Sequence, residues 1–296
     1  MRVVCIGSLN IDHVYRVDHL VRPGETIASS EYQVFAGGKG ANQAAALARA
    51  GAVVSLAGHI GAEGAWLVDR LRRLGVDTQW TRVVDVPTGH AIIQVDAEGQ
   101  NSIVLYAGAN RTLTGEWAEG VLARFAPGDV LLLQNEVNGV PELIAAGRRH
   151  GLQVCLNPAP CGPEVNAYPL DQVDLLVVNE TEAASLVGPG AAEDQLARLG
   201  ARYPAATTVL TLGPNGAWAR SPSATAYEPA ARVRVVDTTG AGDTFLGFFL
   251  AALGDGLSLD RCLRRASVAA GLCVSRVGAT DSVPTSGEVD ALGSPD

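Results

Sequence analysis

The chain has few of the residues that build disulfide scaffolds and metal centres. Its 296 residues include five cysteines, an odd number, with no Cys-x-x-Cys pair and no His-Glu-x-x-His motif. A disulfide framework or a zinc site is therefore not expected. The default interpretation is that the thiols are buried as small apolar groups.

Basic residues are also scarce, with 22 Lys and Arg against 31 Asp and Glu and a net charge of −9. No Lys/Arg block stands out, which argues against a surface for nucleic acid or an anionic membrane. The longest apolar run, near residues 245–253, is far too short to span a bilayer. The opening "MRVVCIGSLN" leads into a predicted strand rather than a charged-then-apolar leader. We therefore expect a cytoplasmic protein.

Strand-like and helix-like segments alternate along the chain, which is 47% hydrophobic. Strands are expected over residues 2–7, 53–58, 129–134, 152–157, 174–179 and 207–213. Helices are expected over residues 40–50, 63–74, 116–125, 141–150, 194–203, 244–253 and 259–276. This order predicts an α/β fold with a mostly parallel sheet covered on both faces. Ligands then bind at the carboxyl ends of the strands.

Two segments interrupt the alternation. Residues 13–35 hold alternating pieces and a Pro-Gly turn, and residues 91–107 read "AIIQVDAEGQNSIVLYA", a hairpin that turns near Glu98-Gly99. Together they predict a small β-sheet that projects from the main body. It is either a sheet extension or a lid over the site, and the two interpretations are compatible. With no repeat or linker, residues 1–296 are expected to form a single domain.

The stretch "VVDTTGAGDTFLGFFLAAL", residues 235–253, carries the strongest local signal. Residues 231–236 are Val-rich and alternating, which predicts a strand, and the apolar residues from Thr244 on predict a helix. Gly240 and Gly242 then lie in a tight turn before a helix N-terminus, a ready site for phosphate. Asp243 either caps the helix or accepts the proton of an attacking hydroxyl. This stretch alone favours neither role.

Other polar residues follow predicted strands. In "GSLNID", Asn10 and Asp12 suit the hydroxyls of a sugar, although for this hexapeptide alone Asx-turn bonding is the better explanation. In "AGGKGANQAAALARAG", glycines would bring the backbone close to a small ligand that Asn42 binds. Lys39 has either a ligand or solvent as partner. This is not a Walker A loop, because Gly40 follows the lysine.

Further candidates lie along the same predicted sheet edge. Glu136 ends the strand "VLLLQN", and "NPAP" is interpreted as a rigid structural turn. In "NETEA", capping explains Asn179, whereas a place near magnesium or phosphate explains Glu182 better than solvation. A nucleotide would lie against "TLGPNGAW", residues 211–218.

In this order, the motifs resemble those of the ribokinase family within the PfkB carbohydrate kinases. The N-terminal signature is matched by "GGKGANQAAALARAG" and the C-terminal one by "DTTGAGDTFLGFF", with "GSLNID", "YAGAN", "NPAP", "VNETEA" and "TLGPNGAW" around and between them. One such motif is weak evidence, but the ordered set covers nearly the whole chain. The resemblance implies a three-layer α/β sandwich with a mostly parallel central sheet and a β-lid that often forms a dimer clasp.

The resemblance also implies roles for individual residues. Asp243 is the base that deprotonates the sugar's primary hydroxyl, and the amides of Gly240, Ala241 and Gly242 form the anion hole. The implied sugar contacts are Asn10, Asp12, Gly38, Lys39, Asn42, Glu136 and Asp243. The implied contacts to ATP and its Mg²⁺ are Asn179, Glu182, Thr211, Gly213, Asn215, Gly216, Gly242 and Ser267. The implied K⁺ site, several of whose ligands are backbone carbonyls, comprises Asp237, Thr239, Cys273, Arg276, Gly278 and Ser282.

Three positions depart from the family pattern. Leu246 stands where asparagine is common, and Ser267 where Asn or His commonly meets the nucleotide. His90 occupies a lid position that is usually aliphatic. The expected reaction is ATP-dependent phosphorylation of D-ribose at O5 in a homodimer joined through the lid. The alternatives are 2-deoxyribose, a nucleoside whose base stacks on Tyr106 and His90, or a non-catalytic sugar-binding regulator.

Overall fold

A computed structural model describes residues 1–293. It contains a nine-stranded sheet in the order β13-β12-β11-β10-β9-β8-β1-β4-β5. The strands, in chain order, are β1 (Arg2–Ile6), β4 (Val53–Ile60), β5 (Asp77–Val83), β8 (Val130–Gln134), β9 (Gln153–Asn157), β10 (Leu175–Asn179), β11 (Thr207–Thr211), β12 (Ala217–Arg220) and β13 (Thr225–Glu228). Pairing is parallel from β5 to β11, and β12 and β13 add an antiparallel edge. The predicted mostly parallel sheet is confirmed.

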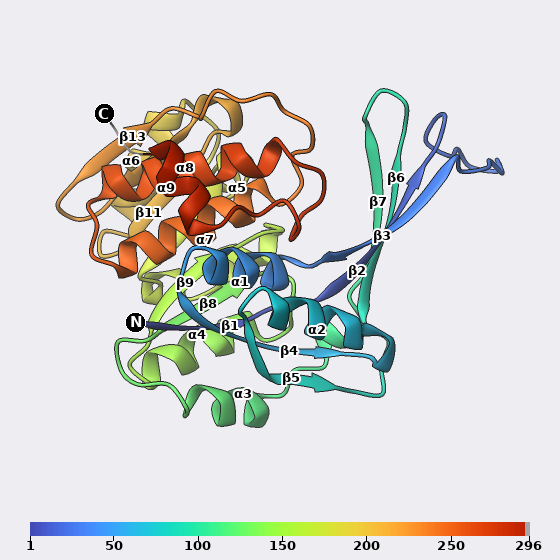
Figure 1. The fold of residues 1–296 in the computed structure, drawn as a ribbon. Coiled ribbons are helices and arrows are strands. Elements are labelled where there is room, and N and C mark those ends of the chain that lie inside the picture. The colour runs from blue at the N-terminus through green and yellow to red at the C-terminus, as the bar shows by residue number, and fades with distance from the viewer. Residues whose placement is uncertain (294–296) are drawn as a thin grey trace.

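Helices cover both faces of this sheet, which gives the predicted three layers (Figure 1). One face packs against a core shared with α1 (Lys39–Arg49), α2 (Ala65–Arg73), α7 (Ala241–Gly254), α8 (Leu259–Val274) and α9 (Ser286–Gly293). The other face packs against α3 (Gly115–Leu122), α4 (Val140–Arg149), α5 (Glu180–Val187) and α6 (Ala192–Arg202). Because the central strands are covered on both sides, their burial is continuous rather than alternating, as in β8.

A second, four-stranded sheet projects from the layers (Figure 1). Its order is β3-β2-β6-β7, from β2 (Asn10–Arg16), β3 (Glu31–Gly37), β6 (Gly89–Val95) and β7 (Asn101–Tyr106). The predicted small sheet is therefore present. Its hairpin turns at residues 96–100, where Gly99 has a φ of 79°. Asn10 and Asp12 belong to β2 itself, not to the carboxyl end of the first strand.

Residues 231–236 are not the strand that their Val-rich alternation predicts. The sheet already ends at β13, whose neighbour is β12. The chain instead runs beside α8, where a Cβ on Gly271 would lie 2.7 Å from the Ala231 side chain. Its valines stay exposed, with Val235 at 60%. The sequence also gave no indication of β5, β12, β13 or α9.

No helix within residues 1–293 is long and apolar enough to cross a membrane.

Candidate active site

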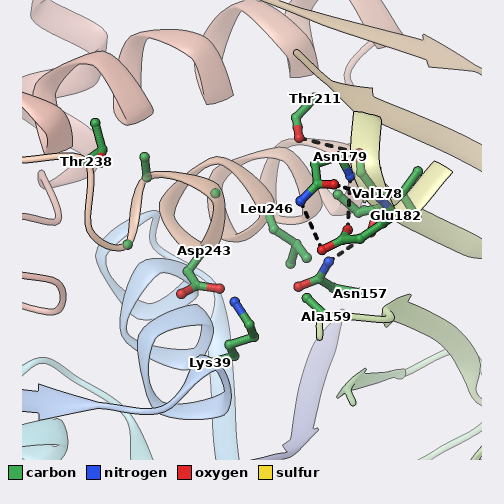
Figure 2. A pocket seen from close by; sticks show the side chains of 14 residues that line it. Lys39, Asn157, Ala159, Val178, Asn179, Glu182, Thr211, Thr238, Asp243 and Leu246 are labelled. Carbon is green, nitrogen blue, oxygen red and sulfur yellow. Dashed lines mark hydrogen bonds between the residues drawn. The ribbon is translucent and has the colours of Figure 1, made fainter. Parts of the chain in front are cut away.

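A cavity of about 250 Å³ lies where three parallel strands end and α7 begins (Figure 2). Asn157, Asn179 and Thr211 are the last residues of β9, β10 and β11, and all three line it. The remaining lining residues are Lys39, Ala159, Val177, Val178, Glu182, Thr238, Gly240, Ala241, Gly242, Asp243 and Leu246. The cavity thus occupies the carboxyl edge of the sheet, where a parallel α/β fold binds its ligands.

The N-terminus of α7 is built to receive an anion. Gly240 is the N-cap residue, with a left-handed φ of 74°, and no side chain caps the helix. The first N–H groups of the helix therefore stay available, at the positive end of the helix dipole. A Cβ added to Gly242 would meet nothing within 4 Å. The turn predicted from the two glycines is present, and it leaves room for a phosphate-sized group.

Asp243 does not cap α7. It is the third residue of the helix and is 7% exposed. Its Oδ2 accepts a hydrogen bond from Asn42 Nδ2 at 3.0 Å, and its Oδ1 accepts one from Gln43 Nε2 at 2.9 Å. Figure 2 shows the Lys39 amine directed toward the carboxylate, whose charge raises the pKa of that lysine above its usual value. The carboxylate therefore faces the cavity with its charge compensated.

The residues expected to bind sugar converge beside Asp243. Glu136 Oε2 accepts hydrogen bonds from the Lys39 backbone N–H at 2.9 Å and from the Ser8 hydroxyl. A Cβ on Gly38 would come within 2.8 Å of the Asn10 nitrogen, so only glycine fits there. The buried Oδ1 of Asn42 has no partner among the described residues. Such a buried acceptor is suited to a ligand hydroxyl.

Asp12 lies in the same group. Burial raises the pKa of its carboxyl to about 6, and the nearby negative charge of Glu136 adds to the rise. A Cβ on Gly37 would lie 2.1 Å from Asp12 Oδ2, so any side chain at position 37 would clash with this carboxylate. The two acids therefore stand close together, although neither belongs to the lining of the cavity.

The expected nucleotide residues divide into two groups. Asn179 and Glu182 form a reciprocal capping box on α5: Asn179 Oδ1 accepts from the Glu182 N–H at 2.8 Å, and Glu182 Oε2 accepts from the Asn179 N–H at 3.0 Å. Burial nevertheless raises the pKa of Glu182, which lines the cavity with Asn179, Thr211 and Gly242. The second group lies outside that lining: Gly213, Asn215, Gly216 and Ser267.

The members of this second group are placed differently. Gly213 and Asn215 belong to the short 3-10 helix η5 (Gly213–Asn215), and Gly216 follows it. All three come directly after β11, at the same edge of the sheet as the cavity. Ser267 is 7% exposed within α8.

The residues of the expected cation site are also brought together. Asp237 Oδ1 accepts from the Thr239 N–H at 2.9 Å, and Oδ2 from the Gly278 N–H at 2.9 Å. Although burial opposes the charge, these bonds hold the pKa of Asp237 below its usual value. Cys273 Sγ lies 3.0 Å from Ser282 Oγ and 3.7 Å from the Thr239 carbonyl.

Arg276 joins the same loop through its backbone. Its N–H donates to the Cys273 carbonyl at 3.0 Å, while its guanidinium turns to Glu288 at 2.6 Å. The loop as a whole packs against the start of α7, because a Cβ on Gly240 would lie 3.1 Å from Ala279.

His90 and Tyr106 do not face the sugar residues, which corrects the expectation that they could stack on a nucleoside base. In the register of the small sheet, Asp12 pairs with Ala91, whereas His90 pairs with Ile11 and Tyr106. Neighbouring residues of a strand point to opposite faces. The rings of His90 and Tyr106 stand 5.0 Å apart on the face away from Asp12.

Sequence reasoning missed three polar side chains behind the cavity. Asn157, taken as part of a structural turn, lines the cavity and accepts from Gln43 Nε2 at 3.1 Å. Gln134 Nε2 donates to Gln43 Oε1 at 2.7 Å. The one available signal was the position of Gln43 directly after Asn42 on a predicted helix. Leu246, one of the departures from the family pattern, lines the cavity with its apolar side chain.

Comparison with known proteins agrees with this geometry. The family model described as pfkB family carbohydrate kinase matches residues 1–286. The ribokinase of Haemophilus influenzae is 37% identical over 95% of this chain and 94% of its own length. The ribokinase of Bacillus subtilis is 36% identical over 99% of both chains.

Solved structures give the same result. Ribokinase from Cryptococcus neoformans, in complex with ADP, has a TM-score of 0.85 and 38% identity over 98% of this chain and 99% of that one. Arabidopsis thaliana ribokinase, complexed with ribose and ATP, has a TM-score of 0.86 and 31% identity over 99% of both chains. With the family model spanning nearly the whole chain, this protein belongs to the pfkB family of carbohydrate kinases.

Proposed function

We propose that the protein transfers the γ-phosphoryl group of ATP to O5 of D-ribose. The observation that carries the proposal is the placement of Asp243. A buried carboxylate, held by two amides, stands three residues into a helix whose N-terminal N–H groups are uncapped. The relatives above, of 31–38% identity, are ribokinases, and one is complexed with ribose and ATP. In this proposal residues 1–296 form one kinase domain.

The base acts on the attacking sugar hydroxyl, and the anion hole acts on the phosphoryl group that is transferred. Asp243 accepts the proton of the sugar's primary hydroxyl as its oxygen attacks phosphorus. The N–H groups of Ala241 and Gly242, with the dipole of α7, stabilise the negative charge that develops on the phosphoryl oxygens. The glycine at position 240 lets the helix begin without a side chain in that space.

The sugar is held beside the base by polar groups that converge there. The unpartnered Oδ1 of Asn42 accepts a hydroxyl hydrogen, and Asp12 and Glu136 supply further acceptors. The amide groups of Asn10 and the Lys39 ammonium donate. Because the Gly38 backbone passes closely, the sugar can lie against the chain. Oriented this way, its primary hydroxyl stays within reach of Asp243.

The nucleotide fits the other end of the cavity. Its phosphates meet the start of α7, and its remainder lies along Thr211, Gly213, Asn215 and Gly216, with Ser267 at the edge of this path. Asn179 and Glu182 face the same space. A Mg²⁺ ion bound with the phosphates would neutralise part of their charge, and such an ion usually keeps several waters. Glu182, already bonded to the backbone of Asn179, suits contact through such waters rather than direct ligation.

The loop beside the anion hole suits a monovalent cation. Asp237 supplies a negative charge, while Thr239, Cys273, Arg276 and Gly278 offer backbone carbonyls and Ser282 a hydroxyl oxygen. Oxygen donors of this kind suit a hard cation. A K⁺ ion there would hold residues 237–240 in the shape that exposes the α7 N–H groups.

We also infer that two copies associate through the small sheet. The face away from Asp12 carries exposed apolar side chains, including Tyr32 at 49%, Val34 at 43%, Ile92 at 43%, Val104 at 66% and Tyr106 at 47%. An exposed apolar sheet face of this kind needs cover. A two-fold pairing covers both copies at once and leaves the opposite, sugar-facing side as a lid over the site.

The reaction is tested by ATP consumption in the presence of ribose, 2-deoxyribose, fructose, adenosine and uridine. Ribose should be the preferred acceptor. With Asp243→Asn, which keeps the shape but takes no proton, kcat should fall by about 10²-fold or more. Calorimetric ribose binding should weaken far less. Preference for adenosine, or a kcat close to that of the wild type in the variant, would refute the assignment of substrate or of base respectively.

Ribose binding should depend on the ionisation of Asp12. The raised pKa, about 6, means that its carboxylate form dominates above pH 7 and is lost as the pH falls through that value. Since the carboxylate accepts the sugar's hydroxyl hydrogens, affinity should be flat above pH 7 and fall by up to about tenfold per unit below pH 6. Calorimetry from pH 8 to pH 5 measures this. Asp12→Asn should bind more weakly with no such slope, and a flat wild-type profile would contradict the role.

Activity should be higher in potassium than in sodium chloride, and lowest in tetramethylammonium chloride, at constant ionic strength. Asp237→Ala removes the negative charge of the site and should abolish most of the difference. Initial rates at saturating ATP and ribose give the comparison. Equal rates in potassium and tetramethylammonium would rule out a functional cation at this loop.

Light scattering at micromolar concentration should give the mass of a dimer. Val104→Asp places a charge on the exposed apolar face and should yield monomers, because pairing would bury that charge. Val53→Asp, at a site 65% exposed on the main sheet, is the matched control and should remain dimeric. A monomeric wild type would end the pairing model and leave the kinase proposal untouched.

A further inference from the structure

Two neighbouring residues of α1 hold the catalytic carboxylate. Asn42 Nδ2 reaches Oδ2 of Asp243 at 3.0 Å, and Gln43 Nε2 reaches Oδ1 at 2.9 Å. Consecutive residues of an α-helix project roughly 100° apart, so the two amides approach the carboxylate from different directions. Each oxygen therefore has one fixed donor, and the orientation of the carboxylate is determined from the α1 side.

Gln43 is itself fixed on all sides. Its Nε2 donates to Asn157 Oδ1 at 3.1 Å as well as to Asp243, and its Oε1 accepts from Gln134 Nε2 at 2.7 Å. A flipped amide would set Oε1 against two oxygens, so these neighbours define which end of the amide faces the base. Asn157 in turn donates to the Val177 carbonyl at 3.0 Å. The arrangement ties Asp243 to the ends of β8 and β9 and, through Asn157, to the middle of β10.

Gln43 differs from Asn42 in its access to the ligand. Asn42 has a free buried acceptor, whereas each of the polar atoms of Gln43 has a protein partner. Gln43 is 0% exposed and does not belong to the lining of the cavity. Any effect of this residue on the reaction must therefore pass through the groups that it holds, which are Asp243 and the cavity-lining Asn157.

We propose that Gln43 is a positioning residue for phosphoryl transfer, which holds the Asp243 carboxylate from the core side so that its free lone pairs face the sugar hydroxyl. The inference rests on the proposed function, in which Asp243 is the base. A neutral amide is suited to this task. It orients the carboxylate without the added positive charge that would make the group a weaker base.

Other charged or titratable groups also act on Asp243. The Lys39 ammonium faces it from α1, Glu182 from α5 and the Cys5 thiol from β1. Burial raises the pKa of Cys5 to about 12, so the thiol is neutral throughout the range of an enzyme assay. These groups stay in place when Gln43 is replaced, and a change in pH dependence then reports the lost hydrogen bond.

The first test is Gln43→Met, which keeps the length of the side chain and removes its hydrogen bonds. For ribose phosphorylation, kcat should fall by about tenfold or more, because a small misplacement of a reacting group is costly. The acid limb of the kcat profile should move to higher pH, since the carboxylate has lost a donor. KM for ribose should stay within about threefold, as expected for a residue that does not touch the sugar.

Gln195→Met is the matched control. Gln195 is 3% exposed on α6 and donates to the Glu180 carbonyl at 3.3 Å, away from Asp243. It should lower the melting temperature and leave kcat and the pH limb unchanged. If Gln43→Met behaves in the same way once corrected for the folded fraction, Gln43 is a structural residue only and the proposal is wrong.

Gln43→Glu provides a variant of the same shape, in case the methionine variant does not fold. Its carboxylate would repel that of Asp243 and favour the protonated, inactive form of the base, so kcat should fall more at pH 6 than at pH 8. An equal fall at both pH values would count against the proposal.

An infrared titration separates this inference from the proposed function. The band of Asp243, identified as the one lost in Asp243→Asn, should titrate at higher pH in Gln43→Glu than in the wild type. That measurement needs no substrate. If the wild type phosphorylates no sugar while the band shifts between the two proteins, the proposed function is wrong, but the coupling between residue 43 and Asp243 is confirmed. If the band does not shift, the coupling is absent whatever the activity.

Discussion

The close crossing of α1 and α7 is the contact on which the site depends. A Cβ added to Gly247 of α7 would lie 2.4 Å from the Ala46 side chain and 2.9 Å from the Leu47 nitrogen. Only glycine on one helix and alanine on the other permit this approach. It brings Asn42 and Gln43 onto Asp243, four residues before Gly247 and so one turn along the same helix. A bulkier residue at this crossing would separate the base from its two amides.

Dedicated hydrogen-bond donors explain how several acids can gather around this site. Asp12, Glu136, Glu182 and Asp243 stand around one region, yet most have dedicated donors: amides for Asp243, the Lys39 N–H and Ser8 hydroxyl for Glu136, and the Asn179 N–H for Glu182. Asp12 has no such donor among the residues that the structure describes, and burial together with the charge of Glu136 raises the pKa of its carboxyl. Where α7 begins, the cavity is lined by the backbone of Gly240, Ala241 and Gly242. The Lys39 ammonium faces the Asp243 carboxylate and offsets its charge.

Sequence patterns predicted the features that depend on local chemistry. The buried strands, the hairpin at residues 96–100 and the glycine turn before α7 each follow from periodicity or backbone freedom. The strand predicted over residues 231–236 is wrong because an alternating pattern states only that a segment suits a sheet. In the structure the sheet ends at β13, and this segment lies beside α8 instead. The prediction that His90 could stack on a nucleoside base is wrong for a related reason. The face of the small sheet on which His90 lies is set by the register of β6 with β2. Register is a tertiary property that a single strand does not encode.

The choice between cap and base for Asp243 could not be made from its own neighbourhood, since the helix start looks the same in both cases. What argues against the cap is a pair of donors two hundred residues earlier in the chain, one of which, Gln43, does not line the cavity. A carboxylate that merely capped α7 would direct its oxygens at the helix N–H groups and compete with an incoming phosphate. Held by α1 instead, it leaves those groups free. The same contact between α1 and α7 therefore both places a carboxylate at the cavity and leaves the first N–H groups of α7 uncapped.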